Sequence, residues 1–390
     1  MGDMRENMSF DLPSVFEGFD DARKAGFLRI KKIKENGGRV AGTFCTFTPV
    51  EILDAAGITP VSLCGMSAET IPAAEAHLPK NMCPLIKSSY GFALTDKCPY
   101  TYFSDIIVGE TTCDGKKKMY ELLGQLKETY VLHLPQSTHI DDAAEMWTRE
   151  LHRFITYLEN RFDVTITDAA LRSAAALRNE ERKARCKLMS LQRLVPPPAY
   201  GYQIYKTLDG AGFKFSRQEV INQLDEMAGC IRSNYEAGKR PVQETAKRIL
   251  ITGCPIGGVL DKTVKVIEER GGVVVCFENC TGIKAATQMV DTESDDIVRA
   301  IAERYLEIGC AVMSPNNRRM EMLESLNHDY SADGVIEIDL QSCTPYIVES
   351  FSVRRHMQSL NVPYLQLETD YTNNDSGQLA TRLEAFLEML

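Results

Sequence analysis

Cysteine is the residue type with the clearest chemical potential in this sequence. The 390-residue chain contains 12 cysteines, too small a share for a scaffold held together by disulfides. In a reducing compartment, thiols serve metal binding or catalysis more often than disulfide formation. Free cysteine is also common as a small apolar residue of the core. The places of the thiols in the fold therefore decide between a metal or redox site and simple packing.

Five cysteines fall at or just past the ends of predicted strands. Open parallel sheets bind ligands outside the carboxyl ends of their strands, so these thiols are candidates for one shared site. Two more cysteines directly precede a proline, an arrangement that interrupts backbone hydrogen bonding and accompanies iron–sulfur ligands in ferredoxins. The strand-end set is Cys45, Cys113, Cys254, Cys280 and Cys343, and the two Cys-Pro pairs outside it are Cys83-Pro84 and Cys98-Pro99.

The spacing of the cysteines excludes several kinds of site. No two of them form a Cys-x-x-Cys pair, which argues against zinc fingers, zinc ribbons and thioredoxin-like redox sites. Isolated thiolates brought together from two lobes suit an iron–sulfur cluster better. The competing interpretation is a set of buried thiols without a metal, and a zinc site is the weaker alternative to both. Cys186, Cys230 and Cys276 fall on predicted helices or inside a strand, and we interpret them as structural.

The elements that must position these thiols alternate between strand and helix in two parts of the chain. This pattern predicts an α/β fold with two Rossmann-like lobes, each built on a parallel sheet, with the site in the cleft between them. We expect an N-terminal lobe over 1–141, a helical segment over 142–245 and a C-terminal lobe over 246–390. The predicted strands are 39–45, 60–63, 103–109 and 130–134 in the first lobe, and 248–253, 273–277, 334–340 and 363–368 in the second.

The helical segment is recognised by its apolar periodicity. Trp147, Leu151 and Phe154 recur at helical spacing, which predicts a core-facing helix. Thr167 is expected to cap a second helix, from Asp168 to about residue 194, and a third is expected over 217–237.

Composition and charge exclude further classes of protein. The net charge of −10 disfavours nucleic-acid binding, which needs a basic surface. No apolar run approaches the length of a membrane span, and the first six residues lack the apolar stretch of a secretory signal. We therefore expect a cytoplasmic protein without a membrane or nucleic-acid partner. The six histidines are scattered singly, so the catalytic residues stay unassigned.

Several motifs together resemble one family, the 2-hydroxyacyl-CoA dehydratases and benzoyl-CoA reductases, over almost the whole chain. Two further segments resemble the branch of that family whose members are double-cubane-cluster reductases. The family motifs are CTFTPVE at 45–51, AAG at 55–57, CPLIKSS at 83–89, ETTCDGKKKMY at 110–120 and Cys343, and the branch motifs are TGCPIGG at 252–258 and ENCTG at 278–282.

The resemblance implies a set of cluster ligands. In the dehydratases three cysteines of each subunit hold one [4Fe–4S] cluster, and the matching positions are Cys83, Cys113 and Cys343. In the double-cubane branch six cysteines hold two bridged cubanes. For the second cubane the resemblance points to Cys254 and Cys280. For the sixth ligand we favour Cys45, because it lies at a strand end that faces the cleft, with Cys98 in reserve. Cys310 resembles a family position that is not a ligand, and we interpret Cys64 as structural.

The resemblance also implies an activity and partners. It favours an oxygen-sensitive, homodimeric iron–sulfur reductase that receives low-potential electrons from a separate ATP-hydrolysing iron–sulfur activator. The chain has no GxxxxGK[ST] phosphate loop, in keeping with ATP hydrolysis on another protein. The substrate would be a small molecule or an acyl-CoA. One alternative is a 2-hydroxyacyl-CoA dehydratase subunit with a single [4Fe–4S] cluster, and another is a non-catalytic cluster carrier.

Overall fold

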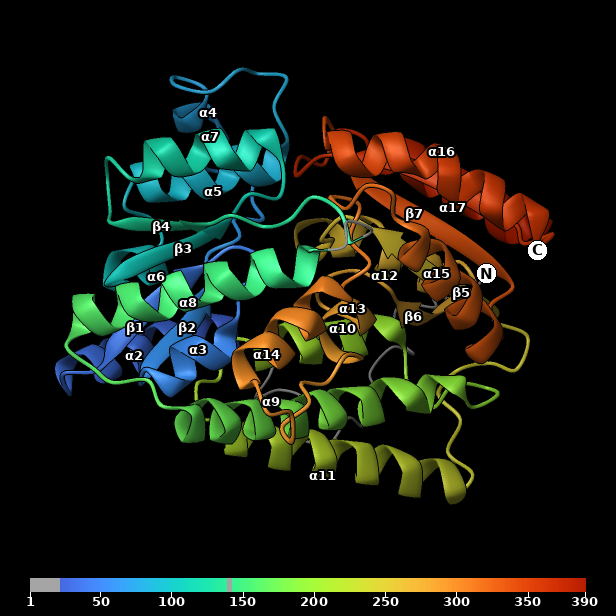
Figure 1. Cartoon of the computed structure of the whole chain (residues 1–390). Coiled ribbons are helices and arrows are strands. Elements are labelled where there is room, and N and C mark those ends of the chain that lie inside the picture. Colours follow the sequence, from blue (N-terminus) through green and yellow to red (C-terminus); the bar gives the residue numbers. More distant parts are fainter. Residues whose placement is uncertain (1–21, 139–141) are drawn as a thin grey trace.

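The computed structural model describes residues 22–138 and 142–390, and it contains two parallel sheets of four strands each (Figure 1). The predicted α/β class with two Rossmann-like lobes is confirmed. The prediction that there is no secretory signal concerns Met1–Glu6, which lie outside the described residues. The strands are β1 (Arg39–Thr43), β2 (Ile58–Ser62), β3 (Ile106–Glu110), β4 (Thr129–Leu132), β5 (Lys247–Gly253), β6 (Gly272–Phe277), β7 (Gly334–Leu340) and β8 (Tyr364–Thr369).

The two sheets share one topology. The strand order is β2-β1-β3-β4 in the first and β6-β5-β7-β8 in the second. In each sheet the first strand of the lobe therefore lies between the next two, and the loops after neighbouring strands leave to opposite sides. This is the switch point at which open α/β sheets form a ligand crevice. It lies between β1 and β3 in one lobe and between β5 and β7 in the other.

Helices cover both faces of each sheet, so the central strands are buried on both sides. All residues of β3, β6 and β7 are buried, which explains their near-continuous apolar sequences. The first lobe contains α2 (Ala22–Glu35), α3 (Val50–Ala55), α4 (Ile71–Ala74), α5 (Pro84–Leu94), α6 (Pro99–Phe103) and α7 (Asp114–Leu123). The second contains α12 (Val264–Glu269), α13 (Ile283–Ala286), α14 (Ile297–Leu306), α15 (Asn317–Asp329), α16 (Thr344–Ser359) and α17 (Ser376–Met389).

Four helices lie along the chain between the strands of the two lobes. They are α8 (Ala143–Phe162), α9 (Asp168–Ser190), α10 (Gly201–Ala211) and α11 (Arg217–Glu236). Trp147, Leu151 and Phe154 of α8 are fully buried, as their spacing predicts. The Thr167 hydroxyl accepts a hydrogen bond from Ala170 N and caps α9. Because α9 packs against α3 of the first lobe and against α13 and α14 of the second, this segment joins the two lobes. The exact domain boundaries stay a prediction.

Two local predictions differ from the structure. The strand expected from residue 103 begins at Ile106, because residues 99–103 form α6. The segment Thr48-Pro49-Val50-Glu51 has the pattern of a helix start with Thr48 as the cap and Pro49 as the first helical residue. In the structure α3 begins at Val50, and the Thr48 hydroxyl hydrogen-bonds to the Glu110 carboxylate instead of capping the helix. Among the described residues, no helix is long and apolar enough to cross a membrane.

Gly253 ends β5 in a conformation that other residues rarely adopt. Its φ is +105°, and an added Cβ would lie 2.4 Å from the backbone oxygen of Ile338. We expect Gly253→Ala to lower the free energy of unfolding by about 2–3 kcal/mol, measured by urea denaturation. The matched control is Gly229→Ala on α11, where the added methyl meets no atom within 4 Å. That change should stabilise the helix by about 0.5–1 kcal/mol, and equal losses for both variants would contradict this explanation.

Candidate functional site

A cavity of about 780 Å³ lies between the lobes and α9. This volume is in the range of small-molecule and cofactor sites. Seven of the 12 cysteines line it, including five of the six predicted ligands. The lining cysteines are Cys45, Cys64, Cys83, Cys113, Cys280, Cys310 and Cys343.

Three of the lining cysteines are the N-cap residue of a helix, the residue directly before its first turn. Cys83 precedes α5, Cys113 precedes α7 and Cys343 precedes α16. Backbone N–H groups in the first turn of each helix act to lower the pKa of the thiol, against the larger effects that raise it. The unpaired N–H groups and the dipole of a helix both attract negative charge at this end. Three helix ends that share one cavity therefore suit an anionic cofactor held by thiolates.

These three thiols and Cys254 form what we term the first thiol group. The Cys343 thiol is within hydrogen-bonding reach of the thiols of Cys83 and Cys254. The contact with Cys343 and burial together raise the pKa of Cys83 well above its usual value. Burial raises the pKa of Cys113, with a further contribution from the charge of Cys83. Thiols that hinder one another's ionisation in this way would ionise readily only with a cation in their midst.

Cys45, Cys280 and Cys310 form the second thiol group. Burial raises the pKa of Cys45 well above its usual value; the charge of Lys116 opposes this shift, while the charges of Cys280 and Cys310 add to it. The pKa of Cys280 is likewise raised by burial, with Lys284 acting against it and Cys310 adding to it. The thiol of Cys310 lies 3.7 Å from the hydroxyl of Tyr346, and that hydroxyl accepts a hydrogen bond from Lys284 Nζ at 3.0 Å.

Nothing in the sequence indicates that Cys310 belongs to this group. It follows α14 instead of a strand, and only the folding of that helix against α8 and α9 brings it to the cavity.

Cys254 is 1% exposed and does not line the cavity, and its sulfur accepts a hydrogen bond from Leu340 N at 3.3 Å. Cys98 also lies outside the lining and caps α6 through Thr101 N.

The arrangement of the thiols is unlike a site for a single metal ion. Within residues 22–138 and 142–390, no three His, Cys, Asp or Glu side chains are close enough together to hold one ion. A zinc site needs all of its sulfur ligands at about 2.3 Å from one centre. An iron–sulfur cluster binds each thiolate to a different iron, so its ligands stand farther apart. The donor set therefore fits a cluster better than zinc.

Of the three consecutive lysines after Cys113, only Lys116 turns to the cavity. Lys117 and Lys118 are exposed and pair with Asp114 and Glu121 on their own helix. The Lys116 ammonium donates a hydrogen bond to Phe44 O at 3.0 Å, and it interacts electrostatically with Cys45 and Cys64. It therefore supplies positive charge beside the second thiol group.

A fully buried ion-pair network supports the loops that carry Cys280 and Cys343. Arg319 is its centre and lies 2.9 Å from Glu337, 2.6 Å from Glu349 and 3.6 Å from Glu278. Lys284 pairs with Glu278 at 2.7 Å. Buried pairs of this kind are costly to break, because the remaining partner is left charged without water. The network therefore fixes the ends of β5, β6 and β7 at the cavity.

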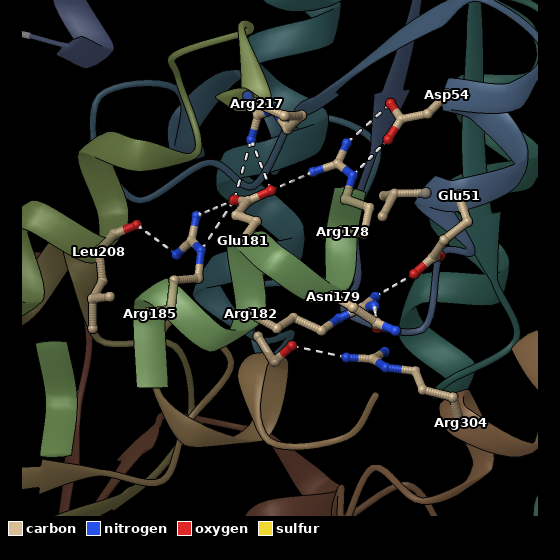
Figure 2. A network of polar contacts seen from close by, with 12 residues as sticks. Glu51, Asp54, Arg178, Asn179, Glu181, Arg182, Arg185, Leu208, Arg217 and Arg304 are labelled. Atoms are coloured by element: carbon tan, nitrogen blue, oxygen red, sulfur yellow. Dashed lines mark hydrogen bonds and ion pairs between the residues drawn. The ribbon is translucent and has the colours of Figure 1, made fainter. Parts of the chain in front are cut away.

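A second network joins α9 to both lobes (Figure 2). Arg178 binds both carboxylate oxygens of Asp54 in α3, and Arg185 and Arg217 surround Glu181. Arg182 pairs with the buried carboxylate of Glu51, also in α3. The other oxygen of Glu51 accepts a hydrogen bond from Tyr305 of α14 at 2.8 Å. One wall of the cavity is thus fixed by ion pairs between the helical segment and the first lobe and by a hydrogen bond from the second lobe.

Glu51 makes a specific contribution to the dependence of stability on pH. Burial alone would raise the pKa of Glu51, but Arg182 and Arg304 outweigh burial and lower it from 4.5 to about 2. The resulting stabilisation is present above pH 4.5 and is lost as the pH falls towards 2. We expect wild type to be more stable than Glu51→Gln at neutral pH. This advantage should fall by about 1 kcal/mol between about pH 6 and about pH 3.5.

Urea denaturation across this pH range measures the effect. Glu145→Gln is the control, because Glu145 is exposed on α8 and makes only a long ion pair of 3.8 Å with Arg149. A difference between wild type and Glu51→Gln that stays constant with pH would show that Glu51 does not titrate as described.

Known proteins match this chain over most or nearly all of its length. A family model described as "2-hydroxyglutaryl-CoA dehydratase, D-component" matches residues 45–390. An Escherichia coli (strain K12) protein named "Putative dehydratase subunit YjiM" is 50% identical over 97% of this chain and 99% of its own length. The beta subunit of (R)-phenyllactyl-CoA dehydratase from Clostridium sporogenes is 22% identical over 93% of this chain and 94% of its own. A benzoyl-CoA reductase subunit from Thauera aromatica is 24% identical over 85% of each chain. The resemblance carried by the cysteine motifs is confirmed, and the chain belongs to the 2-hydroxyglutaryl-CoA dehydratase D-component family.

Proposed function

We propose that this protein is an iron–sulfur reductase with a double-cubane cluster in the cavity between its lobes. The observation that carries the proposal is the presence of two groups of thiols, contributed by both lobes, around one cavity. A protein that needed cysteine only for packing would have no reason to gather seven thiols on a cavity wall. Three helix N-termini directed at the first group add electrostatic support for an anionic cofactor.

Each thiol group has a proposed role. Cys83, Cys113 and Cys343 would hold one cubane, as the family resemblance implies. Cys45 and Cys280 would hold the second, and we propose Cys310 as their third partner because it interacts with both. Cys254 remains the alternative third ligand, since its thiol is in contact with that of Cys343. Cys98, the reserve of the sequence-based prediction, is the least favoured because it does not line the cavity.

The residues around the thiols would adjust the potential of the bound cluster and limit its contact with water. When bound, an iron–sulfur cluster supplies single electrons at a potential set by charge, hydrogen bonds to sulfur and burial. Lys116 and Lys284 place positive charge beside the second thiol group, which favours a more negative state of whatever those thiols bind. Tyr346 adds a hydroxyl next to Cys310. The apolar part of the cavity lining, with Phe44, Leu85 and Ile86, would limit the access of water to the sulfur atoms.

The proposal includes partners outside this chain. Electrons would come from a separate iron–sulfur ATPase, since this sequence has no phosphate loop of its own. The substrate would be a small molecule or an acyl-CoA. We further propose a cytoplasmic homodimer that is sensitive to oxygen, because the cysteines of one chain could hold the whole cluster.

A dehydratase subunit with a single [4Fe–4S] cluster is the second candidate. It is favoured by the names of the relatives, among them an (R)-phenyllactyl-CoA dehydratase subunit. It is also consistent with the first thiol group, which by itself offers enough ligands for one cubane. The two candidates differ in how much iron the second thiol group binds.

Iron and acid-labile sulfide per chain, after expression and purification without oxygen, separate the candidates. The double cubane predicts about eight irons per chain, and the single cubane about four. For the double cubane, Cys280→Ala and Cys310→Ala should each lose about half of the iron or more, because one cubane then lacks a ligand. For the single cubane these two variants should keep all of their iron, while Cys83→Ala, Cys113→Ala and Cys343→Ala should lose it.

Two further variants complete this experiment. Cys254→Ala should keep its iron if Cys310 is the sixth ligand, and should lose part of it if Cys254 is. Cys230→Ala is the matched control, because Cys230 lies on α11 and outside the cavity lining. An anoxic wild-type protein that binds no iron, even after reconstitution with iron and sulfide, would overturn both candidate functions.

A further inference from the structure

Part of the cavity wall is built from arginine instead of cysteine. Three of the four arginines on this wall have a carboxylate partner, either in α3 or on α9 itself. The fourth, Arg304, does not. The four are Arg178, Arg182, Arg185 and Arg304.

Arg304 is held rigidly but keeps hydrogen-bonding capacity. Its side chain is buried, with the residue 4% exposed. Nε donates to Gln288 O at 3.0 Å and Nη2 donates to Ala285 O at 2.8 Å. The guanidinium carbon lies 4.4 Å from the centre of the Tyr305 ring. The remaining nitrogen, Nη1, has no hydrogen-bond partner in the described part of the chain, and Arg304 lines the cavity.

The surroundings of Arg304 carry an excess of positive charge. Among the charged residues labelled in Figure 2, arginines outnumber the carboxylates that they face: Arg178, Arg182, Arg185, Arg217 and Arg304 stand against Glu51, Asp54 and Glu181. Burial and the neighbouring charge of Arg182 lower the pKa of Arg304 to about 10, so it stays charged at neutral pH. The Glu51 carboxylate also acts on Arg304, but it is ion-paired with Arg182, so Arg304 has no ion pair of its own, which is unfavourable for a buried charge. An anion in the cavity would relieve this cost.

We propose that Arg304 binds a carboxylate or phosphate group of the substrate, and hence that the substrate is an anion. A guanidinium group recognises both oxyanions through its planar set of N–H donors. The cavity that contains Arg304 is also lined by both thiol groups. A substrate bound through its anionic group to Arg304 could therefore reach the thiol-lined part with its reacting group. This inference deepens the proposed function. It rests on that function, because the proposed function identifies the cavity as the substrate site.

The test is isothermal titration calorimetry on the anoxically purified protein. The probes are inorganic phosphate, acetate and coenzyme A, titrated separately. We expect at least one of them to bind wild type, and Arg304→Gln to weaken that binding at least about tenfold. Arg304→Lys keeps the charge without the fork of donors, so its binding should be intermediate. Binding of phosphate or acetate alone identifies a small anion, whereas Arg304-dependent binding of coenzyme A alone identifies a coenzyme phosphate.

Arg172→Gln is the matched control. Arg172 lies on α9 and, like Arg304 of α14, donates to backbone oxygens of the second lobe, those of Thr292 and Asp295, but it does not line the cavity. It should bind the probes as wild type does. If no probe binds wild type, or if Arg304→Gln binds as tightly as wild type, the inference is overturned.

Iron and sulfide are measured on the same samples, which separates the two proposals. All of the arginine variants should keep the wild-type iron content, because Arg304 contacts backbone oxygens and no thiol. Iron-loaded protein that binds no anion overturns the inference alone. Protein without iron overturns the proposed function, and the comparison of Arg304→Gln with wild type still decides whether Arg304 binds anions.

Discussion

Three helices each follow directly after a cysteine, all three cysteines line one cavity, and the site depends on these helix ends being held together. Two of these helices, α5 and α7, belong to the first lobe, and the third, α16, belongs to the second. Their thiols can meet only if the switch points of both sheets open towards each other. The cavity is lined by residues that follow strands of both sheets, among them Cys45 after β1 and Cys280 after β6, so both sheets present carboxyl ends of strands to it. The site therefore depends on the relative position of the lobes more than on either lobe alone.

Buried charge fixes that relative position. Glu51 of the first lobe, Arg182 of the helical segment and Tyr305 of the second lobe are linked through one carboxylate. Within the second lobe, Arg319 holds three carboxylates around the strand ends that precede Cys280 and Cys343. Such pairs gain little net free energy from being formed, but each is costly to break. They thus favour one arrangement of the lobes over looser ones, and they leave Arg304 as a cation that an anionic substrate could neutralise.

Local patterns in the sequence predicted the parts of the site that depend on local structure. Cys45, Cys113, Cys280 and Cys343 follow strands that are evident from the sequence, so their place at the carboxyl ends of the two sheets could be predicted. Cys310 and Arg304 could not be, because both depend on how α14 packs against the helical segment. Cys254 shows that a correctly predicted strand end does not by itself place a thiol in the cavity. It follows a strand as predicted, yet its sulfur accepts a hydrogen bond from Leu340 N and does not line the cavity. The prediction that Thr48 caps a helix was wrong for a similar reason, because the carboxylate of Glu110, distant in the sequence, accepts the hydrogen bond of its hydroxyl.

The central claim is that thiols from both lobes hold one iron–sulfur cofactor in this cavity. The most direct test is anomalous diffraction at the iron absorption edge from crystals of anoxically purified protein. The account predicts two adjacent groups of iron between the lobes, one bound by Cys83, Cys113 and Cys343 and the other by the second thiol group. Iron-loaded crystals with their anomalous density elsewhere, or bound by the cysteines of one lobe only, would contradict it.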